Sequence, residues 1–238
     1  MTCLQNKKQI KVALASMLIV ASAMGTTFSA QAHPDHDEET DRKNHVERSY
    51  DYQGFDKISV VGVYNMDVKA GESSFSIKTS GEERYMSNLN VYVDDGTLYL
   101  ENDEDEKTRS WRGKNNKGID ITITLPSLSG LDVTGIGNGE IYGIDSDEFE
   151  VDFAGLGAME LSGRCGKFDA DYAGMGEIDA RDLECEDVTI DMSGMGSASV
   201  YASESVDADM SGMGNIEVFG KPKNVKKSKG FMSSVDIH

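Results

Sequence analysis

The sequence is poor in proline, tryptophan, cysteine and histidine. Its 238 residues include 3 Pro, 1 Trp, 3 Cys and 4 His, whereas Gly occurs 25 times. Few long stretches favour a helix, so the composition predicts a single all-β domain of ordinary size. Every His lies in the first 45 residues or at the last position, so the predicted strands lack a Ser, His and acid set for nucleophilic hydrolysis.

Basic residues are also scarce. The chain has 23 Lys and Arg against 42 Asp and Glu, a formal net charge of −19. A surface this acidic repels phosphate, which excludes nucleic acid as a partner and disfavours polyanionic glycans. The same charge attracts divalent cations, so weak binding of Ca²⁺ stays open beside a purely solubilising role.

No apolar run is long enough to cross a membrane. The longest, VALASMLIVASAM, follows Lys7, Lys8 and Lys11 and precedes the small-residue cleavage pattern Ala30-Gln31-Ala32. This arrangement predicts a secretory signal peptide over residues 1–32, and hence export to the periplasm, the outer surface or the extracellular space. Cys3 lies before the apolar run, so it is not the acylated cysteine of a lipoprotein signal.

Residues 33–46 are polar and lack apolar periodicity, which predicts a disordered leader. His33, His36 and His45 lie there among carboxylates and could chelate zinc or copper. They have no fixed metal-ligand spacing, so a solvated tail is the favoured interpretation and no metal ligand is assigned.

Residues 47–127 predict irregular N-terminal strands, because apolar or β-branched residues occupy every second position. Asp95-Gly96 between two such runs indicates a hairpin or tight turn. The charged stretch NDEDEKTRSWRGKNNK contains Trp111 between Arg109 and Arg112. It is either a recognition tip or a tolerated loop insertion, and the second interpretation is favoured.

Regular repeats occupy residues 128–225. A Gly-apolar-Gly triplet begins at Gly135, Gly155, Gly174, Gly194 and Gly212, with spacings of 20, 19, 20 and 18 residues. This period is too short for helical repeats and fits one coil of a β-solenoid. The predicted domain, residues 47–238, is therefore a single-stranded parallel β-helix with coils of 18–20 residues, and a right-handed coil is expected.

Alignment of the repeats on the first glycine gives columns of constant character. Two apolar columns precede the triplet: Leu131, Val151, Ala170, Ile190 and Ala208, then Val133, Phe153, Tyr172, Met192 and Met210. Between them stands an aspartate in every repeat: Asp132, Asp152, Asp171, Asp191 and Asp209. The alternation predicts strands that bury the apolar columns and expose the aspartates. We expect solvated aspartates, with Ca²⁺ bridging as the alternative.

The middle residue of each triplet is large and apolar, and we expect it to point into the core at a corner of the coil. Several are methionines, which can bind copper, but they alternate with Leu and Ile, so core filling is the favoured interpretation. GIGNGEIYG resembles a dinucleotide-binding loop, yet strand patterning follows it, and no cofactor is predicted.

Cys165 and Cys185 each stand three residues before an apolar residue that opens a strand, Phe168 and Val188. They should occupy neighbouring coils, about 4.8 Å apart, within the range of a disulfide. A Cys165–Cys185 disulfide is favoured over two free thiols.

The basic stretch after residue 219 breaks the columns, although Gly230 begins what looks like a decayed sixth repeat. We expect residues 226–238 to form an irregular cap against edge-to-edge association. Lys226, Lys227 and Lys229 could alternatively contact an acidic neighbour or lipid headgroups.

The stretches GFDKISVVGVYNMDVKAGE, VDDGTLYLEN and IDITITLPSLSGLDVTGIGNGEI, with the successive GMG repeats, resemble the putative auto-transporter adhesins with a head GIN domain. The resemblance implies a two-sheet parallel β-helix with triplets at the turns, and adhesion at the surface of Gram-negative bacteria. The middle residue, usually small in that family, is Met, Leu or Ile here. No secretion or anchoring domain is recognisable, which argues against direct auto-transport.

The sequence thus predicts an exported, non-catalytic adhesion or interaction module of the cell envelope. Its acidic sheet faces would bind a surface glycan or protein. A periplasmic structural or envelope-signalling component is the alternative. A polysaccharide-active enzyme is less favoured, because Arg164 and Arg181 share no column and no carboxylate pair stands out as catalytic.

Overall fold

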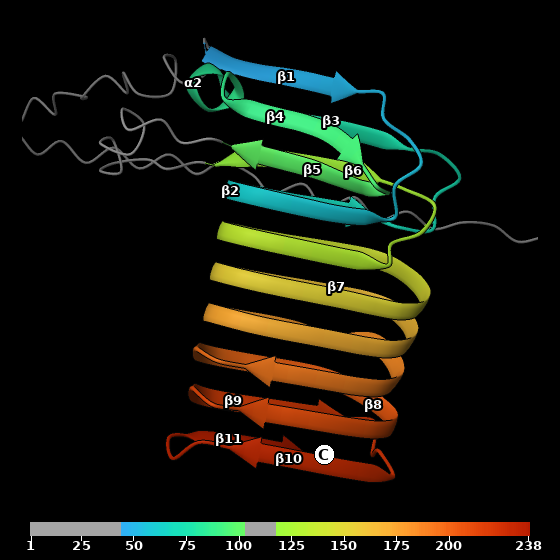
Figure 1. Ribbon diagram of the computed structural model, residues 1–238, viewed down its shortest axis with the longest axis vertical. Helices are drawn as coiled ribbons and strands as arrows, with labels where there is room; N and C mark the ends of the chain where they lie inside the picture. Colours follow the sequence, from blue (N-terminus) through green and yellow to red (C-terminus); the bar gives the residue numbers. More distant parts are fainter. Residues whose placement is uncertain (1–43, 103–117) are drawn as a thin grey trace, which may run out of the picture. The chain divides into compact units, whose positions relative to one another are not determined.

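The computed structural model describes residues 44–102 and 118–238. These residues are almost entirely β-strand and form one mixed sheet, which is not closed (Figure 1). The predicted signal peptide, His33, His36 and the insertion with Arg109, Trp111 and Arg112 lie outside the described residues. No described helix is long and apolar enough to span a membrane.

The N-terminal strands pair in both directions. They are β1 (His45–Tyr50), β2 (Lys57–Lys69), β3 (Ser76–Glu82), β4 (Leu89–Asp94), β5 (Thr97–Asn102) and β6 (Ile119–Thr124), with the short helix α2 (Glu83–Met86) after β3. β3 pairs antiparallel with β1 and β6, whereas β2 pairs parallel with β5, β6 and β7. Because β1 begins at His45, strand structure starts inside the segment predicted to be a leader.

The predicted turn at Asp95-Gly96 is confirmed. It joins the antiparallel strands β4 and β5, and both residues have the positive φ angles, 43° and 75°, that a tight hairpin requires.

The remaining strands follow one another in parallel register. They are β7 (Gly130–Met192), β8 (Met195–Met210), β9 (Met213–Phe219), β10 (Asn224–Lys229) and β11 (Ser233–Ile237). Met175 pairs with Met195, and Met195 pairs with Met213, so each triplet lies against the next. Figure 1 shows successive passes of β7 side by side. The predicted period of the repeat therefore equals the observed spacing between paired segments.

The repeat begins earlier than the sequence analysis placed it. Gly62, Val63 and Tyr64 of β2 pair residue by residue with Gly135, Ile136 and Gly137. The segment was missed because its third triplet position is Tyr rather than Gly. β2 is therefore a repeat of the same kind, and it joins the regular repeats to the mixed N-terminal strands.

The inward columns are confirmed. The two apolar columns before the triplet are buried throughout, as are two columns after it: Met159, Ile178, Ala198 and Ile216, then Leu161, Ala180, Val200 and Val218. They merge into one hydrophobic core that also includes residues of β2, β5 and β6. Since no single repeat can bury such a face alone, the core exists only where repeats stack.

The predicted position of the triplet's middle residue is wrong. Ile136, Leu156, Met175, Met195 and Met213 are all exposed. The two-residue alternation continues through the corner, so the glycines take the inward positions and the residue between them points outward. A Cβ atom at Gly157 would overlap the carbonyl oxygen of Gly137 in the neighbouring repeat, which explains why the inward positions are glycine.

The predicted irregular C-terminal cap is also wrong in part. β10 pairs parallel with residues 205–210 of β8, and β11 pairs parallel with residues 214–218 of β9, so the sixth repeat keeps the register. Lys227 stands beside the buried Ala208, and its Nζ donates a hydrogen bond to the backbone carbonyl of Val235, 3.1 Å away. A lysine thus replaces an apolar residue in an inward column at the last repeat.

The Cys165–Cys185 disulfide is confirmed. The two Cα atoms lie 4.5 Å apart and the sulfurs are bonded. The bond closes a link across 20 residues, one period of the repeat, so it joins neighbouring repeats covalently.

Candidate interaction surface

The aspartate column, Asp132, Asp152, Asp171, Asp191 and Asp209, is the most regular charged feature of the described surface. Asp191 pairs in register with Asp209, and Asp132 pairs with Ser59 of β2. Four of the five side chains are exposed and Asp209 is half-buried. Neighbouring strands place such residues about 4.8 Å apart, so the carboxylates form a closely spaced row.

The carboxylates of this column are not neutralised. None of the five makes an ion pair with another residue of the described ranges. Partial burial raises the pKa of Asp152, and the charges of Glu150, Asp171 and Asp132 raise it further. The pKa of Asp191 is likewise raised, first by burial and then by Asp171 and Asp209. The column is therefore a site of mutual repulsion, where a cationic partner group would be stabilised.

Other carboxylates of the repeats are paired with cations. Their partners stand 19 residues later, one repeat along: Asp145 with Arg164, Glu148 with Lys167, Glu204 with Lys223, and Asp207 with Lys226, at 2.6 to 3.0 Å. Arg164 holds the pKa of Asp145 below its usual range by hydrogen bonding and by its charge. Arg164, once considered for catalysis, is thus engaged by a carboxylate.

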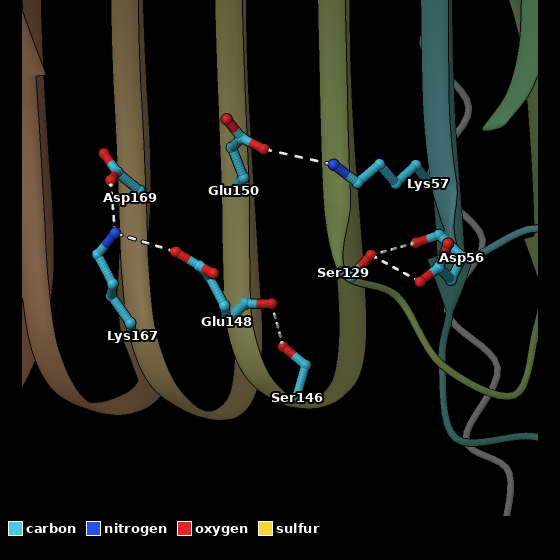
Figure 2. A network of polar contacts seen from close by, with 8 residues as sticks. All are labelled: Asp56, Lys57, Ser129, Ser146, Glu148, Glu150, Lys167 and Asp169. Atoms are coloured by element: carbon cyan, nitrogen blue, oxygen red, sulfur yellow. Dashed lines mark hydrogen bonds and ion pairs between the residues drawn. The ribbon is translucent and has the colours of Figure 1, made fainter. Parts of the chain in front are cut away.

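Figure 2 shows the pair of Glu148 and Lys167 with other polar contacts that link successive repeats. Lys167 Nζ lies 3.0 Å from Glu148 of the preceding repeat and 3.1 Å from Asp169. Lys57 of β2 reaches Glu150 at 3.5 Å, and Ser129 Oγ donates to the carboxylate of Asp56 at 2.9 Å. All these groups are substantially exposed, so each pair contributes little to stability by itself.

A second acidic column lies beyond the triplets. It consists of Asp67, Glu140, Glu160, Asp179, Glu217 and Asp236, with Ser199 at the intervening position. Arg181 pairs with Asp179 and lowers its pKa, and the Tyr142 hydroxyl donates to Glu140, which raises the tyrosine pKa to about 12. Arg181, the other basic residue considered for catalysis, is therefore also held by a carboxylate.

An apolar ridge runs between the two acidic columns. It consists of the middle residues of the triplets and their equivalents in β2 and the sixth repeat: Val63, Ile136, Leu156, Met175, Met195, Met213 and Met232. All are exposed except the half-buried Val63. The sequence pattern could have revealed this ridge. The middle residue lies an even number of positions from the exposed aspartate, and such residues share one face of a strand.

An open groove lies beside the disulfide. Its volume is about 830 Å³, and its lining includes Asp145, Asp147, Glu148, Glu184 and Glu186. Among residues 44–102 and 118–238, however, no three His, Cys, Asp or Glu side chains are grouped so as to hold a metal ion. The groove thus offers negative charge without a compact cation cage.

Among the described residues, two buried tyrosine hydroxyls lack a hydrogen-bond partner, a feature that the sequence did not predict. The OH groups of Tyr64 and Tyr172 are inaccessible to solvent and have no hydrogen-bond partner among the described residues. Burial raises the pKa of Tyr172 to about 12 and raises that of Tyr64 well above its usual range. Both hydroxyls therefore stay protonated at neutral pH, and neither is placed to act on a ligand at the surface.

Solved structures with a similar fold carry adhesin or lipid-binding descriptions. A putative adhesin from Bacteroides fragilis has a TM-score of 0.67 and 25% identity, over 82% of this chain and 98% of its own. A putative lipid binding protein from Parabacteroides distasonis has a TM-score of 0.46 and 20% identity, over 82% and 97% of the two chains. A putative cell adhesion protein from Clostridium sporogenes has a TM-score of 0.41 and 17% identity, over 81% and 98%. None of the curated proteins matches the chain.

The family comparison covers most of the repeats and N-terminal strands. The family model described as "Putative auto-transporter adhesin, head GIN domain" matches residues 54–222. Neither this family nor the similar structures are named as enzymes. The match spans the two acidic columns and the apolar ridge except Asp236 and Met232, and the chain therefore belongs to the head GIN domain family of putative auto-transporter adhesins.

Proposed function

We propose that this chain is an exported, non-catalytic binding module of the cell envelope, built as a parallel β-solenoid. Its signal peptide, residues 1–32, would direct export, and its acidic columns would bind a glycan or protein at a cell surface. The family description and the adhesin from Bacteroides fragilis support a role in adhesion.

One observation carries the proposal: five carboxylates stand in register, and none of them forms an ion pair with a cation of the described residues. The repeats place cations one period after other carboxylates, as Lys167 is placed after Glu148, but not after the aspartates of the column. An unpaired row of like charges has an energetic cost, which a partner with regularly spaced cationic groups would remove. Ca²⁺ would compete with such a partner for the same oxygens.

Two measurements test the proposal. Protease treatment of intact cells should remove the protein if it lies at the surface; complete protection would instead favour a periplasmic structural or signalling component. Beads coated with the full chain should then adhere to intact cells, and added NaCl or Ca²⁺ should weaken adhesion.

The matched variants separate this column from net charge. Replacement of Asp152, Asp171 and Asp191 by Asn should reduce bead adhesion severalfold. Replacement of three paired carboxylates, Asp145→Asn, Glu148→Gln and Glu204→Gln, changes the formal charge equally and should reduce it much less. Equal loss in both sets would contradict a role for the column, and cleavage of a glycan by the purified chain would contradict a non-catalytic role.

A further inference from the structure

Four methionines of the apolar ridge stand in one row on consecutive repeats. Met175 pairs with Met195, and Met195 pairs with Met213. Ser233 pairs with Gly214, so Met232 stands beside Met213, and the Gly214 N–H donates to the Met232 carbonyl oxygen at 3.3 Å. The row belongs to the last four repeats, whereas the earlier positions hold Val63, Ile136 and Leu156.

The four methionines are exposed to solvent. The exposed fractions of Met175, Met195, Met213 and Met232 are 44%, 44%, 40% and 59%. The first three lie between glycines or beside them, so no adjacent side chain shields the sulfur. These methionines therefore do not fill the core, and their sulfurs can act as ligands at the surface.

Three of these methionines line one hollow. Met195, Met213 and Met232 face it together with Phe231, Ser193 and Ser211, and its volume is about 530 Å³. No charged side chain lines it. It therefore offers sulfur and hydroxyl groups, but none of the carboxylates that Ca²⁺ or Mg²⁺ prefers.

The spacing of the row suits a shared ion. Strand pairing places equivalent residues about 4.8 Å apart. With a metal–sulfur bond of about 2.3 Å, as for zinc thiolates, two sulfurs on one ion lie within about 4.6 Å of each other. Methionine has three rotatable bonds, so small side-chain rotations can bring neighbouring sulfurs to that distance without moving the backbone.

The sulfur ligand atoms in the row determine which ions it can bind. Thioethers are soft ligands that favour Cu(I), whereas carboxylates and carbonyls favour Mg²⁺ and Ca²⁺. A ridge that served only as an apolar surface would be equally well made of Ile and Leu, as it is in the earlier repeats. The acidic columns on both sides add a negative potential that attracts any cation toward the row.

We propose that Met195 and Met213, together with Met175 or Met232, form a thioether site for one soft monovalent cation, Cu(I) or Ag(I). Met195 and Met213 are the central ligands because each has a methionine on both sides. Met175 and Met232 stand at the two ends of the row, too far apart for both sulfurs to reach one ion, so either one supplies the third sulfur. The site lies between the two acidic columns and is separate from the carboxylates proposed to bind a cell-surface partner.

The test uses the full chain with Cys3→Ser, so that no free thiol remains while the Cys165–Cys185 bond is intact. Ag(I) is titrated in chloride-free buffer, and Cu(I) is titrated anaerobically against a chromogenic competitor. We expect one ion per chain. With methionine ¹³C-methyl labels, the four ridge signals should shift on addition of Ag(I), whereas the buried Met159, Met192 and Met210 should not.

Variants distinguish the row from other soft ligands. Met195→Leu should weaken Ag(I) binding at least about tenfold, which corresponds to about 1.4 kcal/mol. Replacement of all four ridge methionines by Leu should abolish the site, and the matched control Met192→Leu should leave it unchanged. Circular dichroism verifies that each variant is folded.

Three outcomes would overturn the proposal. The first is unchanged binding in the fourfold Leu variant, which would place the ion on histidines or carboxylates. The second is the absence of methyl shifts when Ag(I) binds. The third is displacement of bound Ag(I) by Ca²⁺, which would indicate oxygen ligands.

Discussion

The aspartate column and the ion-paired carboxylates are built from the same repeats but differ in electrostatic compensation. Glu148 and Asp145 each pair with a cation 19 residues later, whereas Asp152 and Asp191 form no ion pair with a described residue and have pKa values raised by burial and by neighbouring carboxylates. A basic residue one repeat later in the sequence can therefore lie beside an outward carboxylate in this fold. The aspartates form no ion pair among the described residues because of the side chains at the neighbouring positions and not because the architecture forbids one.

The largest effect should come from breaking the alignment on which both arrangements depend. In Gly157→Val the new side chain would overlap the backbone of the neighbouring repeat at Gly137, and the native φ of Gly157, 154°, disfavours it as well. We expect a loss of at least about 3 kcal/mol in the free energy of unfolding, measured by urea denaturation. Gly130→Ala is the control, since its Cβ would meet only the flexible side chain of Lys57. If Gly157→Val lowered the free energy of unfolding as little as Gly130→Ala does, the inward corner would have room for a side chain.

The second-largest effect on stability should come from removal of the Cys165–Cys185 disulfide, which lies beside the Arg164–Asp145 pair. Replacement of Cys165 and Cys185 by Ser frees a loop of 20 residues and should lower the free energy of unfolding by about 3 kcal/mol. Denaturation of this double variant against the oxidised parent measures the change. A thiol assay of the unreduced parent should find neither cysteine reactive; two reactive thiols would refute the bond.

A smaller effect, of opposite sign in the two sets, is expected for single carboxylates. Asp191→Asn removes repulsion from Asp171 and Asp209 and should raise the free energy of unfolding at pH 7 by a few tenths of a kcal/mol, because solvent screens exposed charges. Glu148→Gln removes the partner of Lys167 and should slightly lower it. Higher salt should reduce both changes. The same sign for both variants would contradict the distinction between the columns.

The pH dependence sharpens the same comparison. Asp191 has a raised pKa in the folded protein, so its ionisation penalises folding above that pKa, and the penalty disappears as the pH falls through it. Asp145 has a lowered pKa, so its contribution is present above the unfolded value and is lost as the pH falls through the folded pKa. The gain from Asp191→Asn should therefore vanish first on acidification, and the loss from Asp145→Asn should vanish at lower pH. Denaturation curves over pH 3 to 7, roughly the range around free carboxyl pKa values, test this order.

The periodic features were predictable because they are local and repeated. Alternation identified the buried columns containing Phe153 and Ile178, and the period placed Cys165 beside Cys185. The antiparallel pairing of β1 with β3 could not be predicted, because those strands share no repeated pattern with the rest. Tyr64 concealed the first repeat for the same reason, since a single changed position removes the triplet.

The candidate surface was predicted only in part. The aspartate column followed from its constant position, but the cation partners of Asp145 and Glu148 were overlooked because those carboxylates lie in the more variable part of the repeat. The methionines were placed on the wrong side, because the bulk and apolarity of Met175 and Met195 suggested a core role. Their orientation depends on the lack of space inside the corner, which hydrophobicity does not report.

The sequence by itself determined the length of the repeat, the residues that fill the core and the cysteines that meet, because period and alternation are written directly in the order of the residues. Only the tertiary structure decided that the middle residue of the triplet points outward, which carboxylates pair with a cation, and that the last repeat pairs in register with the repeat before it. These depend on backbone atoms of neighbouring repeats, which come into contact only when the chain has stacked.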